Sequence, residues 1–173
     1  MRKIYRLLIL FTILGGGIGS SIVSFYIIGF LNYGVIEESY SFYCTPEIIT
    51  EPEKIRIDTN GRTINIKHNT SSMPYYMKAD ANLKVEGMYM KDSDYDYFIT
   101  EGHYLPSENI TELVVYSFGR TLGLFYHPSW TAKYNININI TLRTDISYDL
   151  YLNVEDTDIF ISENLDINEL IIN

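Results

Sequence analysis

The positions of apolar residues divide the chain into two parts. Residues 7–31 are mostly apolar and contain no Asp, Glu, Lys or Arg, whereas apolar and polar residues alternate along much of the remaining chain. As a helix, an uncharged run of this length reaches about 37 Å, and the hydrocarbon core of a bilayer is about 30 Å thick. The first pattern therefore predicts a transmembrane helix, and the second predicts strands that bury one face.

The clearest alternation lies in residues 134–142, where Tyr, Ile and Leu occupy every second position and Asn or Thr the positions between. These apolar residues would surround a helix on all sides, so a long strand with one buried face is expected. Residues 81–90 and 110–118 show the pattern more weakly, and short alternating runs succeed one another over residues 150–172. Residues 91–108 are polar and are expected to form a long loop.

Short strands at this spacing, with no helix evident after residue 31, predict an all-β domain. Two architectures fit this pattern: a sandwich, or a short solenoid-like stack of antiparallel strands. The last alternating run ends at Asn173. Its strand is expected to be an exposed edge, a shortened rung, or a surface completed by a partner.

Asn60-Gly61 lies between two short Ile-containing runs and predicts a β-hairpin. Both residues accept the positive φ that a type I′ turn requires, and a two-residue loop fixes the register of the strands. In that register Ile57 pairs with Ile64. The next isoleucines along the two strands also pair, so all four side chains are expected on one face.

These patterns predict four regions along the chain. A basic flank and an apolar anchor come first, and a linker with little periodicity separates the anchor from the strand-rich part. The predicted boundaries are a cytoplasmic flank at residues 1–6, a transmembrane anchor at residues 7–31, a juxtamembrane linker at residues 32–53 and an extracytoplasmic β domain at residues 54–173.

Arg2, Lys3 and Arg6 give the apolar run a basic N-terminal flank. Positive flanks stay in the cytoplasm, so the prediction is a single-pass signal-anchor protein of the cell membrane, with an extracellular C-terminal domain. A cleaved signal peptide is the alternative, with a small-residue cleavage site at residues 17–19. Cleavage there would leave the apolar second half of the run at a free N-terminus in water, which favours the uncleaved anchor.

Gly15 and Gly19 stand four residues apart in the predicted anchor. Small residues at this spacing let two helix backbones approach closely in lipid. The anchor is therefore expected to associate with a second copy, forming a homodimer, or with another membrane protein. The alternative is that glycine is merely tolerated in a membrane helix.

Charge narrows the choice of partners. The chain contains 13 Lys and Arg against 22 Asp and Glu, a net charge of −9. Three of the bases precede the anchor and no acid does, so the outer part has 10 bases against 22 acids, a net charge of −12. This charge repels nucleic acid and anionic lipid, and no nucleic-acid partner is expected. A cation, a basic partner or a merely solvated acidic surface remains open.

Cys44 is the sole cysteine, so no internal disulfide can form and the domain must be held by its core. A free or buried thiol is expected, with an intermolecular bridge as the alternative. Cys44 also lies too far beyond the apolar run to fit a lipidated cysteine. Sequons at Asn69, Asn109 and Asn139 are candidate glycosylation sites that fit an exterior location.

Asp92, Asp94 and Asp96 alternate along the polar segment and are the best candidate metal ligands. Alternating carboxylates on a loop can converge on Ca²⁺, which prefers oxygen ligands, although Tyr97 stands where an EF-hand requires glycine. A solvated acidic turn is the alternative. No cofactor other than calcium is expected. The histidines have no zinc-site spacing and no catalytic motif occurs, so an enzyme is not predicted.

Several segments resemble a known family. Residues 55–66 (IRIDTNGRTINI), 139–150 (NITLRTDISYDL), 156–161 (DTDIFI) and 165–172 (LDINELII) are similar to the archaeal toast-rack family of adhesin-like β-stack proteins. In this family a hydrophobic strand, a Gly turn and a strand of alternating Ile repeat along a stack. Many members stand on the envelope behind an N-terminal membrane segment. Residues 155–158 (EDTD) replace the Gly turn that is common in the family.

The resemblance implies a surface-displayed binding or structural module, with no catalytic residues to carry over. Together with the predicted anchor, it leads us to expect a membrane-anchored extracytoplasmic β domain of unknown ligand, acting as an envelope binding or adhesion-like structural module. The alternative function is an accessory single-pass subunit of a membrane protein complex, associating through its Gly/Ser-rich helix.

Overall fold

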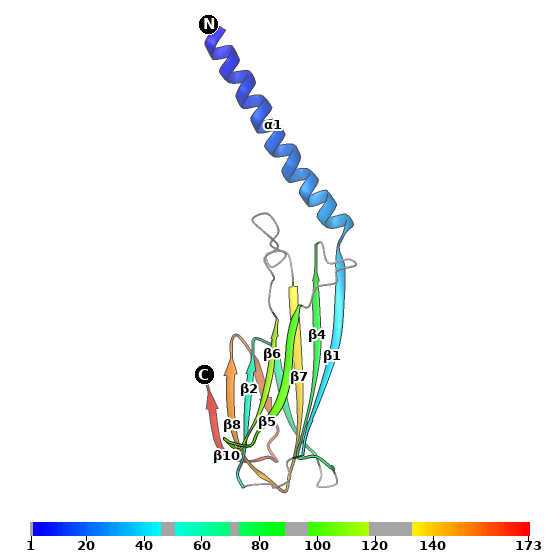
Figure 1. The fold of residues 1–173 in the computed structure, drawn as a ribbon, viewed down its shortest axis with the longest axis vertical. Helices are drawn as coiled ribbons and strands as arrows, with labels where there is room; N and C mark the ends of the chain where they lie inside the picture. Colours follow the sequence, from blue (N-terminus) through cyan, green and yellow to red (C-terminus); the bar gives the residue numbers. More distant parts are fainter. Residues whose placement is uncertain (1, 46–50, 70–72, 89–96, 118–132) are drawn as a thin grey trace.

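The computed structural model of the chain describes the backbone of residues 2–45, 51–69, 73–88, 97–117 and 133–173, and their side chains apart from those of residues 2–12, 29 and 30. One helix precedes a two-layer β domain and points away from it (Figure 1). The elements are α1 (Arg2–Leu31), β1 (Gly34–Cys44), β2 (Glu53–Thr59), β3 (Thr63–Asn69), β4 (Met77–Gly87), β5 (Phe98–Leu105), β6 (Ile110–Ser117), β7 (Lys133–Arg143), β8 (Ser147–Val154), β9 (Asp158–Ile161) and β10 (Asp166–Ile172).

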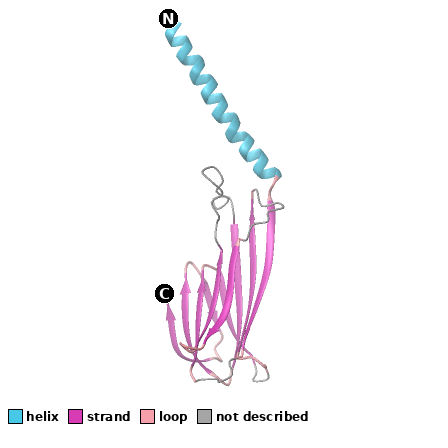
Figure 2. Ribbon diagram, viewed as in Figure 1, coloured by secondary structure: helices cyan, strands magenta, loops and turns pink. Residues whose placement is uncertain are grey.

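The described strands form two five-stranded sheets, which run along the long axis of the domain (Figure 2). Sheet A has the order β1-β4-β7-β3-β9, and sheet B has the order β10-β8-β2-β6-β5. Alternating apolar residues from both sheets lie in one core, so the sheets pack face to face. The predicted all-β domain is therefore confirmed, and of the two expected architectures the packed sheets match the sandwich.

The prediction of antiparallel strands is wrong for much of the domain. In sheet B, β2 runs parallel to both β6 and β8, and β10 runs parallel to β8. In sheet A, β3 runs parallel to both β7 and β9. The antiparallel pairs are β1 with β4, β4 with β7, and β5 with β6. The reason is that the chain changes sheet at every connection from β6 to β10, so successive strands of one sheet run the same way, as in a solenoid.

The turn at residues 60–61 does not form the predicted hairpin. β2 lies in sheet B and β3 in sheet A, so Ile57 and Ile64 belong to different sheets. The Arg62 N–H donates to the carbonyl of Ile136 in β7 at 3.0 Å, which directs the chain into sheet A. All four isoleucines are nevertheless buried, because they face the core from opposite sides. Two strands that each bury one face satisfy the same sequence pattern across a sandwich as within a hairpin.

Alternation correctly predicts which side chains of β7 are buried. Ile136, Ile138, Ile140 and Leu142 are at most 1% exposed, and the Asn and Thr residues between them face outward. The inward series of β4 is buried in the same way. Burying one such side chain completely contributes roughly 1.5–3 kcal/mol relative to leaving it exposed, so this layer is the main attraction between the sheets.

The β domain begins earlier and contains more strand than expected. β1 occupies much of the predicted linker at residues 32–53 and pairs with β4 along its whole length. Glu38 lies in the inward-facing series between Ile36 and Tyr40. This charged residue interrupts the alternation of apolar and polar positions that would have predicted a strand. β5 lies within residues 91–108, where a loop was expected. It is an edge strand of sheet B, a position that tolerates polar side chains.

The two ends of the sandwich differ. At one end β1 contacts β5, and the ring of Phe42 lies directly against the backbone of Gly102. At the other end β9 and β10 are edge strands, and Phe160, Leu170 and Ile172 are 59%, 43% and 52% exposed. The last strand is therefore an exposed edge within the described part of the chain, which was the first of the three expectations.

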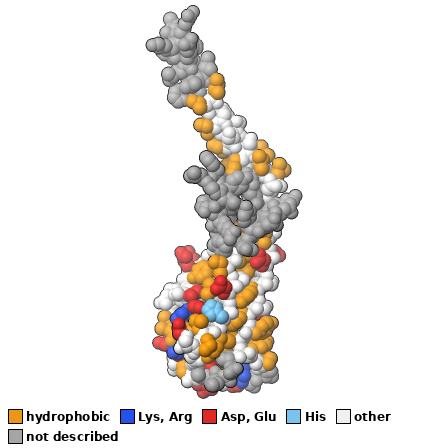
Figure 3. Space-filling view, viewed as in Figure 1, with side chains coloured by type: hydrophobic (Ala, Val, Ile, Leu, Met, Phe, Trp, Pro, Cys, Tyr) orange, Lys and Arg blue, Asp and Glu red, His pale blue; other side chains and the backbone are white. Residues whose placement is uncertain are grey.

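The predicted N-terminal helix is confirmed as α1, and most of its described apolar side chains are exposed, as the orange atoms along it in Figure 3 show. Among the described residues, no helix is long and apolar enough to cross a membrane. The transmembrane assignment of residues 7–31 thus has no support from the structure and stays a prediction.

Candidate functional site

The outward-facing residues of sheet A form a polar surface that we call the amide face. Strand register aligns them in rows: Asn82 lies opposite both Ser39 and Asn137, and the next row joins Asp80 to Asn139. The amide face consists of Ser39 and Ser41 of β1, Asp80, Asn82 and Lys84 of β4, Asn135, Asn137 and Asn139 of β7, and Asn65 of β3.

Part of the amide face is hydrogen-bonded internally. Ser41 Oγ donates to Asp80 Oδ1 at 2.8 Å, and Lys78 Nζ lies 2.6 Å from Asp80 Oδ2. The hydrogen bond to Asp80 raises the pKa of Lys78. Across β3 and β7, Asn65 Nδ2 donates to Asn139 Oδ1 at 3.1 Å. These side chains therefore already use much of their hydrogen-bonding capacity on one another.

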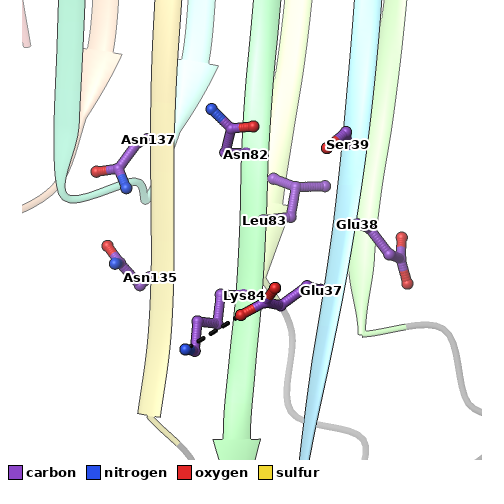
Figure 4. Close-up of a pocket in the computed structure, with 8 residues that line it drawn as sticks. All are labelled: Glu37, Glu38, Ser39, Asn82, Leu83, Lys84, Asn135 and Asn137. Atoms are coloured by element: carbon purple, nitrogen blue, oxygen red, sulfur yellow. Dashed lines mark ion pairs between the residues drawn. The ribbon is translucent and has the colours of Figure 1, made fainter.

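Three amides of this face differ from the rest. Asn82, Asn135 and Asn137 make no side-chain hydrogen bond to any described residue. They line a shallow hollow of about 250 Å³ over β1, β4 and β7. Figure 4 shows Asn82 on β4 beside Asn137 on β7, with Glu37 reaching toward Lys84 at the rim. Each amide carries two N–H donors and an acceptor oxygen, so the hollow offers unused hydrogen-bonding capacity.

A second hollow of about 230 Å³ adjoins the first, because Lys84 and Asn135 line both. The other residues that line it are Arg62, Glu86, Lys133 and Tyr134. We refer to the first as the amide hollow and to the second as the basic hollow, and together they form a groove along β4 and β7.

The basic hollow carries positive charge in an acidic protein. Lys84 Nζ lies 3.2 Å from Glu37 Oε1 and 3.9 Å from Glu86 Oε2. Arg62 and Lys133 form no ion pair with any residue in the described part of the chain. Among the described residues, two cations without an acidic partner therefore lie beside three amides without a hydrogen-bond partner. This arrangement can hold a polar ligand by hydrogen bonds and charge.

The candidate calcium ligands Asp92, Asp94 and Asp96 lie outside the described residues. No group of three or more His, Cys, Asp or Glu that could hold a metal ion occurs among the residues that are described. Calcium binding by the acidic segment therefore stays a prediction.

Gly15 and Gly19 lie on α1, where an added Cβ would meet no atom within 4 Å. No described residue thus covers the face that they form, and helix association stays a prediction. The three sequons differ in their surroundings. Asn69 is exposed at the end of β3, Asn139 belongs to the amide face, and Asn109 lies in a turn with φ of 52°. Glycosylation likewise stays a prediction.

Cys44 is a buried thiol within a small polar cluster. Its Sγ lies 3.3 Å from Thr111 Oγ1, and the Tyr76 hydroxyl also hydrogen-bonds Thr111. Burial, with a further contribution from the hydrogen bond to Cys44, raises the pKa of Tyr76. The expectation of a free or buried thiol is confirmed, since Cys44 is 4% exposed and cannot reach another chain unless the domain opens.

The sequence indicated part of the amide face. The alternation in residues 134–142 places Asn135 and Asn137 on a polar side of one strand. Neither Asn82 nor Arg62 carries a motif that marks it. Both join the groove through the pairing of β7 with β4 on one side and with β3 on the other. These residues are far apart in the sequence, so the sequence alone does not predict that they are neighbours.

No protein-family model matches the chain, and no curated protein sequence matches it. Among solved structures, the chain is similar to a "putative cell adhesion protein" from Clostridium sporogenes, at 13% sequence identity and a TM-score of 0.45. The likeness covers 79% of this chain and 57% of that protein, so the chain spans little more than half of its length. A likeness this distant carries no inference about function. It also gives no support to the archaeal toast-rack resemblance.

Proposed function

We propose that the chain is a membrane-anchored binding module of the cell envelope, with α1 as the anchor and the amide face as the recognition surface. The observation that carries the binding function is the group of three amides, Asn82, Asn135 and Asn137, without hydrogen-bond partners among the described residues. Such a surface gains hydrogen bonds from a ligand without first breaking its own. Strands hold the side chains in place, which reduces the entropy lost on binding.

The proposed anchor rests on the sequence. Residues 7–31 are uncharged, follow a basic flank, and as a helix exceed the roughly 30 Å that a bilayer core requires. This run includes residues 7–12, 29 and 30, whose side chains are not among those described. The basic flank favours a cytoplasmic N-terminus and an external β domain.

The junction between helix and domain suits a module that bears load. Two residues, Asn32 and Tyr33, separate α1 from β1, and the Asn32 N–H donates to the carbonyl of Ile28 at 3.1 Å. β1 then pairs with β4 from Gly34 to Cys44. A pull along the strands is shared by this whole ladder, because its hydrogen bonds lie across the direction of load.

Thiol labelling of intact cells tests the proposed location. Phe160→Cys places a thiol at an exposed position of β9, and Arg2→Cys places one before the anchor, while Cys44 is 4% exposed and gives little background. A membrane-impermeant maleimide is expected to label position 160 before lysis and position 2 only after lysis. Labelling of position 2 on intact cells, or of position 160 only after lysis, contradicts the proposal.

A second candidate function is an accessory subunit held in a membrane complex through α1. The observation that favours it is the glycine face at Gly15 and Gly19, which no described residue covers. Replacing both glycines with Leu is expected to abolish copurification of a membrane partner if this function is correct. A partner that is retained by the double variant leaves the β domain as the recognition element.

A further inference from the structure

The groove of the amide face has a regular geometry. β4 and β7 pair Asn82 with Asn137, Lys84 with Asn135, and Glu86 with Lys133. Successive pairs on one face of a sheet are about 6.6 Å apart along the strands, so the three rows span about 13 Å. The rows change in character from amide to cation along this length. The groove therefore suits an extended ligand whose two ends differ.

The amide end fits hydroxyl groups. An Asn side chain both donates and accepts hydrogen bonds, as does a sugar hydroxyl, so adjacent hydroxyls of one sugar ring can engage both atoms of one amide. Asn82 and Asn137 stand side by side on neighbouring strands with their amides unpaired in the described structure. Neighbouring hydroxyls on a saccharide offer this pattern repeatedly.

The basic end fits a carboxylate. Arg62 and Lys133 have no acidic partner among the described residues, and Lys84 is shared between Glu37 and Glu86. A guanidinium binds a carboxylate through two parallel hydrogen bonds, and nearby ammonium groups add attraction. The net charge of −9 opposes a strongly anionic polymer as a whole. It is compatible with a ligand that places an isolated anionic group at this hollow.

We propose that the groove formed by the amide hollow and the basic hollow binds an acidic saccharide, with sugar hydroxyls on Asn82 and Asn137 and a uronate carboxylate on Arg62 and Lys133. This inference rests on the proposed function, because it names the ligand of the same face. The anionic headgroups of a lipid surface are the competing partner, and the experiment separates the two.

The test is a titration of the full-length chain in neutral detergent at low ionic strength. A glucose oligosaccharide that ends in a single glucuronic acid and the neutral glucose oligosaccharide of equal length are the probes. The acidic saccharide is expected to bind at least about fivefold more tightly, and the difference is expected to shrink in 0.5 M salt because exposed charges are screened. Equal affinity for the two saccharides, or binding of neither at millimolar concentration, overturns the proposal.

Charge variants test the basic hollow. Arg62→Gln and Lys133→Gln are each expected to weaken binding of the acidic saccharide about two- to fivefold and to leave the neutral one unchanged. Glu37→Gln is expected to strengthen it by a similar factor, because Lys84 loses its nearer acidic partner. Lys67→Gln is the matched control: an exposed cation of β3, on the same face but outside both hollows. An equal loss with Lys67→Gln would mean non-specific attraction.

Amide variants test the other end of the groove. Asn82→Ala and Asn137→Ala are each expected to weaken binding of both saccharides about two- to tenfold. Asn153→Ala, at an exposed position of β8 in sheet B, is the control and is expected to change nothing. Thermal unfolding of each variant confirms that the domain is intact. Unchanged affinity in folded Asn82→Ala and Asn137→Ala proteins refutes the role of the amides.

Two further measurements separate the possible failures. Binding to phosphatidylglycerol vesicles that is lost in Arg62→Gln, without saccharide binding, assigns the groove to lipid and overturns the saccharide inference. Retention on purified envelope material that is insensitive to Arg62→Gln and Asn82→Ala also overturns it and removes the amide face as the recognition surface, while an envelope-binding module that uses another surface stands. If the chain is not retained on envelope material, the proposed function itself fails.

Discussion

Replacing Gly102 with Ala probes the contact that joins β1 to sheet B. An ideal Cβ at this position lies 2.5 Å from Cδ2 and 2.6 Å from Cγ of Phe42. Carbon atoms in contact prefer about 3.5–4.0 Å, so the ring must move by about 1 Å or the strands must separate. Overpacking of this kind costs about 1–3 kcal/mol.

The expected net effect includes an opposing contribution. Where an alanine fits the backbone, replacing a glycine stabilises a protein by about 0.4–1 kcal/mol, because the unfolded chain loses freedom. Gly102→Ala is therefore expected to lower the free energy of unfolding by about 0.5–2 kcal/mol. In a Phe42→Ala background the clash disappears, and Gly102→Ala is expected to raise the free energy of unfolding by about 0.4–1 kcal/mol.

Urea unfolding of the four proteins in this double-mutant cycle measures the effect, with the domain followed by fluorescence or circular dichroism. The sign of the Gly102→Ala effect should reverse between the two backgrounds. A Gly102→Ala protein as stable as the parent, or an equal loss in both backgrounds, would show that Phe42 does not lie on Gly102. β1 would then not close this end of the sandwich.

Two other predictions test the fold. The double variant Asn65→Cys/Asn139→Cys is expected to form a disulfide on mild oxidation, since the two residues are register partners in β3 and β7. The double variant Arg56→Cys/Asn65→Cys joins positions that the hairpin would pair, and it is expected to stay reduced because the two positions lie in different sheets. The opposite result would support the hairpin. Tyr148→Phe is expected to lower the free energy of unfolding by about 1–2 kcal/mol in urea, because the buried hydroxyl donates to the Arg143 carbonyl at 3.1 Å. An unchanged unfolding midpoint would contradict that role.

The local sequence pattern predicts which residues of this fold face inward, because successive side chains of a strand point to opposite faces of the sheet. Every second residue of β7 from Ile136 to Leu142 is buried as expected. The same property explains why the hairpin prediction was wrong, since the alternation of side chains does not say which sheet a strand joins. The direction of the chain after Gly61 depends on the hydrogen bond from Arg62 to β7, whose residues lie far along the sequence. Non-local pairing of this kind has no local signal.

Two further differences have physical causes of their own. The sequence pattern did not predict β1, because Glu38 interrupts its series of inward-facing apolar residues. β1 is an edge strand, where a charged side chain can reach water. The sequence pattern did not predict the candidate site for another reason. A binding groove made of Asn82, Asn137 and Arg62 needs three strands in register, and each residue alone is an ordinary polar surface position.

The most direct test of the central claim observes the side-chain amides themselves. Asparagine-selective ¹⁵N labelling allows the side-chain NH₂ signals of Asn82, Asn135 and Asn137 to be followed by NMR while a glucose oligosaccharide that ends in a single glucuronic acid is added. We predict saturable shifts in these three signals and little change in Asn65 and Asn139, whose amides already bond each other. Saturable shifts confined to other asparagines, or no shift at saturating saccharide, would contradict the proposed binding site.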